Sequence, residues 1–182
     1  SALDHVKHRS FSIDNTKGNS GHNHLFVQFG KSGVGKTYSI STLPEKTLLI
    51  DIEGGSASLS DFDIDIIKLG NRPDGSIVPE VERYEQLKDI YMELKTPEMI
   101  EKYDNIVFDS LTEVSNIILA KNEAAFPNSS DKFKLYGEVK KNTIGFFKAA
   151  KDLTKFYNVI FLALSEEDKN EVGARINNIM LN

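Results

Sequence analysis

The chain has 182 residues, a formal net charge of −5 and no cysteine. Hydrophobic residues make up 40% of it and charged residues 27%, which is ordinary for a globular protein. We expect one domain over residues 1–182, which opens with a polar segment over 1–22. The absence of cysteine excludes disulfides and thiolate metal sites. No apolar run approaches the roughly 18 residues of a membrane span. The negative net charge argues against indiscriminate nucleic-acid binding.

The most specific motif of the chain covers residues 30–37 and reads Gly-Lys-Ser-Gly-Val-Gly-Lys-Thr. It follows a run of β-forming residues over 24–29 and precedes a predicted helix that ends before Pro44. Strand, glycine-rich loop and helix are the context of the phosphate-binding P-loop, G-x-x-x-x-G-K-[ST]. Glycines allow a tight turn that points N–H groups at anionic oxygens, and the helix directs its positive end to the same place.

Each position of this loop has a chemical task in binding a nucleotide. Lys36 carries a mobile positive charge toward the β- and γ-phosphates, and the Thr37 hydroxyl is a ligand for Mg²⁺. A glycine-rich turn with an incidental lysine would leave the flanking strand and helix unexplained. We therefore predict a nucleotide-binding loop made of Gly30, Lys31, Ser32, Gly33, Val34, Gly35, Lys36, Thr37 and Tyr38.

The next predicted strand, residues 47–52, is almost continuously apolar, as is typical of a parallel strand covered on both faces. It leads into Glu53 and two glycines, so a carboxylate precedes a sharp turn at the carboxyl end of the strand, where ligands of open α/β sheets collect. A further strand over 64–69 is predicted at the sheet margin. After a turn at 71–75, a helix over 81–94 is predicted from one apolar face made of Tyr84, Leu87, Ile90, Tyr91 and Leu94.

Residues 103–110 form the third clear strand, in which apolar residues lead directly to Asp109 and Ser110. This is the shape of a Walker B strand, whose aspartate helps to hold Mg²⁺ in P-loop NTPases. The alternative is a strand-ending aspartate that caps the following helix. Because a P-loop lies upstream, we favour the metal-holding role for Asp109.

Two helices are predicted next, over residues 111–125 and 134–156, the second with a kink at Gly145. Residues 131–157 contain seven lysines and three acidic residues, a local charge of +4. Such a basic helical stripe could face DNA or a neighbouring subunit, or it could be a solvated outer face. The fourth strand covers 158–165 and ends at Ser165, and a last short strand is expected over 176–181.

A P-loop does not by itself distinguish between classes of NTPase. Residues 51–54 match the D-x-x-G switch motif of GTPases, but they lie only 14 residues after Thr37, and no N-K-x-D motif follows any strand. Small nucleotide or metabolite kinases need an arginine-bearing lid and substrate clamp. This chain has only four arginines, Arg9, Arg72, Arg83 and Arg175.

The strand ends favour a third class. Residues 49–53, Leu-Ile-Asp-Ile-Glu, resemble the second core strand of RecA-like ATPases, which carries their catalytic glutamate. Residues 106–110 resemble their Walker B strand, which also ends Asp-Ser, and residues 159–162 resemble the strand that leads to their sensor residue. More narrowly, the chain looks like the small phage-encoded, AAA-type P-loop ATPases related to RecA, which are often associated with single-strand annealing or recombination.

The resemblance implies a three-layer α/β sandwich with a mainly parallel sheet of core order 5-1-4-3-2, in which the strand of residues 158–165 separates the P-loop strand from the Asp109 strand. It implies Mg²⁺-dependent ATP hydrolysis, with Glu53 and Lys36 catalytic and with Thr37 and Asp109 at the metal. It also implies assembly into a ring or filament in which a neighbouring subunit supplies a cation to the site, and Arg175 and Lys169 are the candidates for that cation. Single-stranded DNA is the implied partner. The implied location is the cytoplasm, that of the host if the chain is phage-encoded, without membrane association.

Two departures from this family qualify the expectation. RecA has a glutamine as sensor, whereas this strand ends in Leu164 and Ser165, of which Ser165 is the better candidate. The chain also stops soon after the fourth strand, which leaves open whether its C-terminal part is truncated. The alternatives that remain are a P-loop kinase of a nucleotide or small molecule, and a nucleotide-gated DNA-binding assembly module with slow hydrolysis.

Overall fold

The computed structural model describes residues 23–29, 46–54, 63–128 and 131–163. They contain a sheet of five strands that all run parallel, in the order β1-β5-β4-β2-β3. Each strand lies where the apolar pattern predicts one, with ends that differ by a few residues. The strands are β1 (Leu25–Phe29), β2 (Thr47–Asp51), β3 (Asp65–Lys68), β4 (Asn105–Asp109) and β5 (Asn158–Ala163).

The strand order confirms the predicted fold class. β5 lies between β1, which leads into the P-loop motif, and β4, which ends at Asp109. β3 extends the sheet beyond β2, at the margin where the sequence predicts it. The predicted order has a further strand beside β1. That position and the short strand predicted over 176–181 lie outside the described residues.

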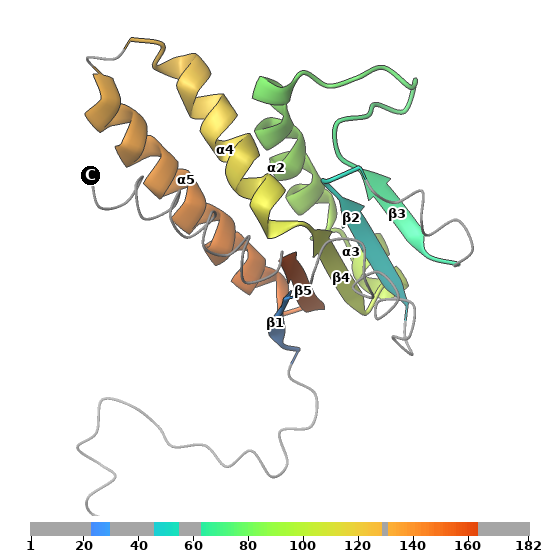
Figure 1. Cartoon of the computed structure of the whole chain (residues 1–182). Coiled ribbons are helices and arrows are strands. Elements are labelled where there is room, and N and C mark those ends of the chain that lie inside the picture. Colours follow the sequence, from blue (N-terminus) through green and yellow to red (C-terminus); the bar gives the residue numbers. More distant parts are fainter. Residues whose placement is uncertain (1–22, 30–45, 55–62, 129–130, 164–182) are drawn as a thin grey trace, which may run out of the picture.

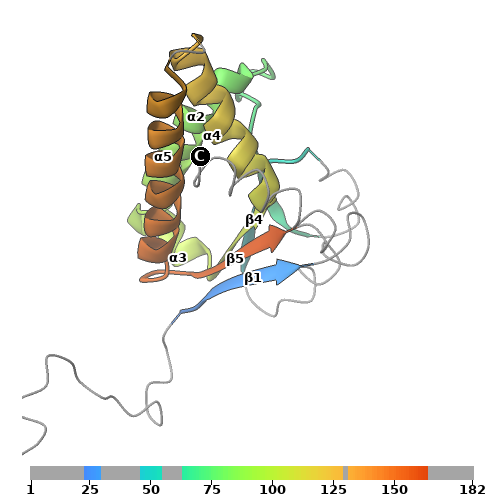
Figure 2. The same ribbon diagram turned by 60° about the vertical axis from the view of Figure 1, so that its left-hand side comes forward.

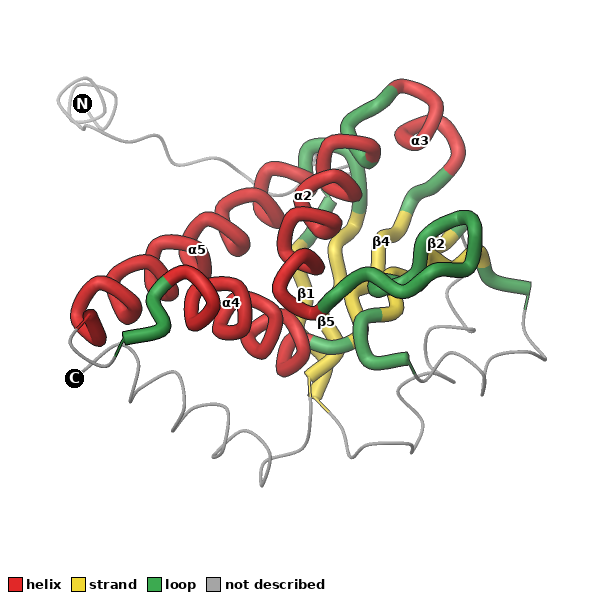
Figure 3. Tube along the Cα trace, turned by 90° about the horizontal axis from the view of Figure 1, so that it is seen from above, coloured by secondary structure: helices red, strands yellow, loops and turns green. Residues whose placement is uncertain are grey.

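Three of the described helices, α2, α4 and α5, lie together on one side of the sheet, as Figures 1 and 3 show. Their bounds are α2 (Arg83–Glu93), α3 (Pro97–Lys102), α4 (Leu111–Ala125) and α5 (Lys132–Leu153), and a 3₁₀ turn, η3 (Glu80–Glu82), precedes α2. α5 is continuous through Gly145, where a kink was expected, and it ends three residues before the predicted end at Phe156. α3 was not predicted, although Thr96 followed by Pro97 is a typical helix start.

The main core lies between the helices and one face of the sheet. Phe108 of β4 and Phe161 of β5 stack with ring centroids 5.1 Å apart, and Phe146 of α5 and Tyr91 of α2 pack against Phe108. The predicted apolar face of α2 is confirmed, because Leu87 and its four companions are all buried. The opposite sheet face carries a smaller apolar cluster made of Leu49, Val107 and Leu162 with Ile64, Ile66 and Ile160. The helix predicted after the P-loop motif lies outside the described residues.

Polar side chains cross the amino-terminal edge of the sheet and satisfy one another. The His24 amide donates to Asn158 Oδ1 (3.1 Å), Asn158 Nδ2 donates to Asn105 Oδ1 (3.1 Å), and Asn105 Nδ2 donates to Thr47 Oγ1 (3.3 Å). This ladder joins four neighbouring strands and accounts for the buried Asn105, so it has a structural role. Among the described helices, none has the length and apolar character that crossing a bilayer demands.

Candidate functional site

The ends of the strands that carry the predicted site residues meet at one edge of the sheet. Asp51 is the register partner of Asp109, Asp109 is the partner of Leu162, and Ala163 is the partner of Phe29. Figure 2 shows β1 and β5 side by side with their arrowheads pointing the same way. With neighbouring strands about 4.8 Å apart, the end of β1 lies about 10 Å from the end of β4.

Asp109 ends β4 and is half-buried at this edge. The N-cap position of α4 belongs to the next residue, Ser110, and the helix has no side-chain cap bond. Asp109 therefore lies one residue before the N-cap, and its role at a metal remains a prediction. Ser110 is fully buried, and its hydroxyl has no hydrogen-bond partner among the residues that the structure describes.

A tight turn at the end of β2 is organised by the carboxylate of Asp51. Asp51 is only 2% exposed, and its Oδ1 accepts a hydrogen bond from the Gly54 amide at 2.8 Å. Gly54 has a φ of +86°, a left-handed conformation that favours glycine. The residue pattern at 51–54 that resembles a GTPase switch motif is thus a turn closed by its own aspartate.

Glu53 lies within this turn, and its backbone is tied to the end of β4. The amides of Ile52 and Glu53 both donate to the carbonyl oxygen of Asp109, at 2.7 Å and 3.1 Å. The Glu53 side chain is exposed. The turn therefore places an accessible carboxylate beside the strand that ends in Asp109.

Asp51 and Asp109 form a neighbouring pair of carboxylates. Register partners in a sheet project from the same face, here the face of Leu49 and Val107. The sequence analysis gave a role only to Asp109. A signal for Asp51 was present in the sequence as well. Asp51 ends a buried apolar strand, and it is followed two residues later by Glu53 and three residues later by Gly54.

Several predicted site residues lie outside the described part of the chain. They are the loop from Gly30 to Lys36, Thr37 and Tyr38, the sensor candidate Ser165, and the candidates for a cation in trans, Lys169 and Arg175. The structure thus brings together Glu53 and Asp109, and it places the last residue before Gly30 at the same edge. Their functional roles remain predictions.

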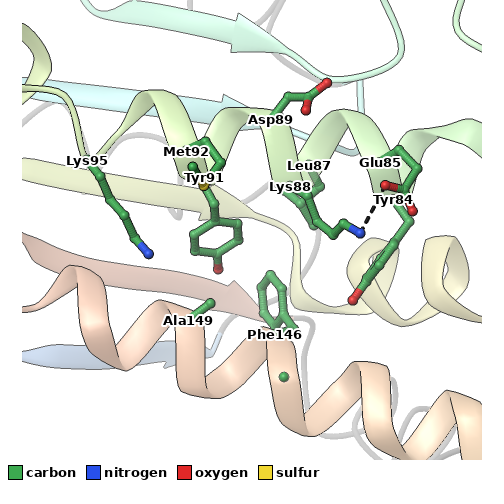
Figure 4. A pocket seen from close by; sticks show the side chains of 11 residues that line it. Tyr84, Glu85, Leu87, Lys88, Asp89, Tyr91, Met92, Lys95, Phe146 and Ala149 are labelled. Atoms are coloured by element: carbon green, nitrogen blue, oxygen red, sulfur yellow. Dashed lines mark ion pairs between the residues drawn. The ribbon is translucent and has the colours of Figure 1, made fainter.

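A separate cavity of about 460 Å³ lies between α2 and α5 (Figure 4). Tyr91 reaches into this region with its hydroxyl toward Ala149, and within the described ranges that buried hydroxyl has no hydrogen-bond partner. Burial raises the pKa of Tyr91, so the phenol stays protonated. The described residues that line this cavity include none of the predicted site residues.

Comparison with protein families places this chain beside a known domain family. The family model described as an AAA domain matches residues 22–180. That stretch includes all five described strands, the P-loop motif and the predicted site residues that follow it. A comparison with curated proteins gives no match.

Proposed function

The chain belongs to the AAA domain family of nucleotide-binding P-loop proteins, and from this premise we propose that it binds and hydrolyses ATP at the carboxyl edge of its sheet in an Mg²⁺-dependent reaction. The observation that carries the proposal is the pair of hydrogen bonds from Ile52 and Glu53 to the Asp109 carbonyl oxygen. They hold two strand-end acids together on the edge where β1 leads into the P-loop motif.

The donor set at this edge suits magnesium. Mg²⁺ prefers oxygen ligands, and it is usually held by one or two protein side chains together with substrate phosphates and water. Asp109 offers a half-buried carboxylate, and Thr37 would add a hydroxyl. Within the described ranges, no three acidic, histidine or cysteine side chains gather into a fuller metal site, and this mode of binding requires none.

In the proposed mechanism the P-loop amides and Lys36 hold the phosphates and stabilise the charge that develops on the transferred group. A bound Mg²⁺ would neutralise phosphate charge, with Thr37 and Asp109 as its protein ligands. Glu53 would orient the attacking water and accept its proton as general base. The exposure of the Glu53 side chain and its attachment to the end of β4 support this assignment.

Two further parts of the proposal come from the resemblance to phage RecA-like ATPases. One is a role in DNA recombination or single-strand annealing, with single-stranded DNA as a partner. The other is assembly into a ring or filament in which Arg175 or Lys169 of one subunit completes the site of the next. The position of β5 between β1 and β4 supports this class over a small kinase, in which those two strands would be neighbours.

A titration of a fluorescent ATP analogue, with Mg²⁺, tests the nucleotide site. We expect Lys36→Ala to weaken binding at least tenfold, because the phosphates lose a direct cation. Lys46→Ala is the matched control, since Lys46 is exposed at the amino-terminal end of β2, the opposite edge of the sheet. Equal affinities of the wild type and the Lys36 variant would overturn the proposal.

Single-turnover ATP hydrolysis with and without single-stranded DNA separates the proposed ATPase from the alternatives. We expect DNA to accelerate hydrolysis. Tight ATP binding without measurable hydrolysis would instead indicate a nucleotide-gated assembly module. Rapid transfer of the γ-phosphoryl group to a small acceptor would indicate a kinase.

A further inference from the structure

α5 presents a basic and partly apolar stripe on the side away from the core. Its core side is formed by Val139, Phe146, Ala150 and Leu153, which are all buried. The outward residues recur at intervals of three or four, so they lie on one face of the helix. The α5 outer stripe consists of this face of the helix, with Phe133, Gly137, Lys140, Ile144, Phe147, Lys148 and Lys151, together with Lys155 in the turn that follows α5.

The positive charge of the stripe is largely uncompensated. Within the described part of the chain, no ion pair involves Lys140, Lys148 or Lys151, whereas Lys155 pairs with Asp152 at 3.6 Å. All four lysines are exposed. The chain as a whole has a net charge of −5, so this cluster of cations contrasts with the rest of the molecule. A chain of this composition gains nothing in solubility from grouping its lysines on one helix face.

Exposed apolar side chains alternate with these cations. Ile144 is 41% exposed, Phe147 38% and Phe133 87%. Two hollows lie along the stripe, one beside Leu25 of β1 and one beside Gly137, and both are lined by Ile144 and Lys148. A side chain added at Gly137 would meet nothing within 4 Å, so the glycine is not required by packing within the described structure. Glycine is less favourable than alanine inside a helix, and its presence here is consistent with close approach of a ligand.

We propose that the α5 outer stripe binds single-stranded nucleic acid. Lysines in a row attract a phosphate backbone, and exposed aromatic rings offer stacking surfaces to unpaired bases, which is how proteins bind single strands without sequence preference. A partner protein with an acidic surface would explain the lysines of the stripe but not the exposed apolar residues between them. The inference rests on the proposed function, to which it adds a location for the DNA partner.

The test compares two triple variants that remove the same charge. One is Lys140→Gln, Lys148→Gln and Lys151→Gln on the stripe. The control is Lys46→Gln, Lys68→Gln and Lys95→Gln, three exposed lysines elsewhere. Binding of a fluorescein-labelled 30-mer oligo(dT) is followed by fluorescence anisotropy between 50 and 200 mM salt, with ATP and Mg²⁺ present. Circular dichroism verifies that each variant is folded.

We expect the stripe variant to bind at least tenfold more weakly than the wild type and the control to change by less than twofold. The slope of log Kd against log salt should fall by roughly 2, because each lost phosphate contact on a single strand contributes about 0.7. Phe147→Leu, which keeps an apolar side chain in the same place, should weaken binding about fivefold without changing the salt slope.

Three outcomes would overturn the inference. Equal weakening in both triple variants, or none in either, would mean that the oligonucleotide binds elsewhere. Loss of self-association in the stripe variant with unchanged DNA affinity would assign the surface to a second copy of the chain. No binding of oligo(dT) by the wild type would remove the DNA partner itself, while the ATP titration would still decide the nucleotide site independently.

Discussion

Glu53 donates its backbone N–H to the carbonyl oxygen of Asp109 over 3.1 Å, although the two residues are far apart in sequence. The amide of Ile52 donates to the same oxygen at 2.7 Å. The turn after β2 is therefore held by the end of β4, and a displacement of either strand end would move the other. This coupling gives the proposed catalytic acid a fixed position relative to the proposed metal ligand.

Replacing Glu53 with Gln should nearly stop ATP hydrolysis and leave ATP binding intact. The amide keeps the size and the backbone bonds of the turn, but it cannot accept a proton from water, so we expect turnover to fall about 10²–10⁴-fold. Single-turnover kinetics and an ATP titration measure the two effects separately. Glu80→Gln, at an exposed position in η3, is the control. Unchanged hydrolysis by the Glu53 variant would refute the assignment.

Asp51→Ala should lower both the free energy of unfolding and the turnover of ATP, whereas the separate variant Asp51→Asn should keep much of the wild-type value of each. Alanine leaves the Gly54 amide without its acceptor, which costs about 1–3 kcal/mol in the free energy of unfolding and loosens the turn that carries Glu53. Asparagine retains an oxygen acceptor at that position. Urea denaturation and steady-state ATPase assays of the two variants provide the measurements. If asparagine is as damaging as alanine, the charge of Asp51 matters rather than its hydrogen bond.

Two buried tyrosines should respond in opposite ways to the loss of a hydroxyl. Tyr157 is fully buried and donates to the Leu94 carbonyl oxygen at 2.6 Å, so Tyr157→Phe should reduce the free energy of unfolding by about 1–3 kcal/mol. The Tyr91 hydroxyl has no partner, so Tyr91→Phe should leave stability unchanged or raise it. Urea denaturation of both variants decides this. A large loss in the Tyr91 variant would indicate a hydrogen bond that the structure does not contain.

The free energy of unfolding should decline in alkaline solution because Tyr157 is buried. Burial raises the pKa of Tyr157 to about 12, from an ordinary value of 10.0. A raised pKa in the folded state means that this contribution to stability is complete below pH 10 and is lost as the pH rises from 10 to about 12. The slope cannot exceed about 1.4 kcal/mol per pH unit for one group. Denaturation of the wild type and of Tyr157→Phe across this range should show a smaller decline in the variant, and parallel curves would contradict the prediction.

A buried polar network between three helices predicts a further stability effect. Tyr84 donates to Asn142, Asn142 donates to Asn122, and Asn122 donates to the Ile118 carbonyl oxygen at 2.8 Å. Asn122 is 3% exposed, so Asn122→Ala would leave the Asn142 amide without its acceptor. We expect a loss of about 1–3 kcal/mol in thermal or urea unfolding, and Asn116→Ala, on the same helix but less buried, should cost less.

The sequence was sufficient for the local features of this protein. Apolar runs that end in an acid predicted β2 and β4, and the spacing of apolar residues predicted α2 and α4. The phosphate-binding loop that the glycine pattern of residues 30–37 predicts lies outside the described residues and stays a prediction. These features depend on neighbouring residues along the chain, so they can be recognised there. The family resemblance then supplied the strand order, which local patterns do not contain.

Only the tertiary structure revealed how the strand ends are joined. Asp51 and Glu53 are adjacent to Asp109 because β2 pairs with β4. The register partners Thr47 and Asn105 at the start of that pairing are 58 positions apart in the sequence, and Asn105 and its hydrogen-bond partner Asn158 of β5 are 53 positions apart. Parallel pairing joins segments that are distant in sequence, and its hydrogen bonds use backbone atoms that every residue possesses. The residue pattern can therefore place an acid at the end of a strand, but the neighbour that the acid meets is decided by the packing of the whole sheet.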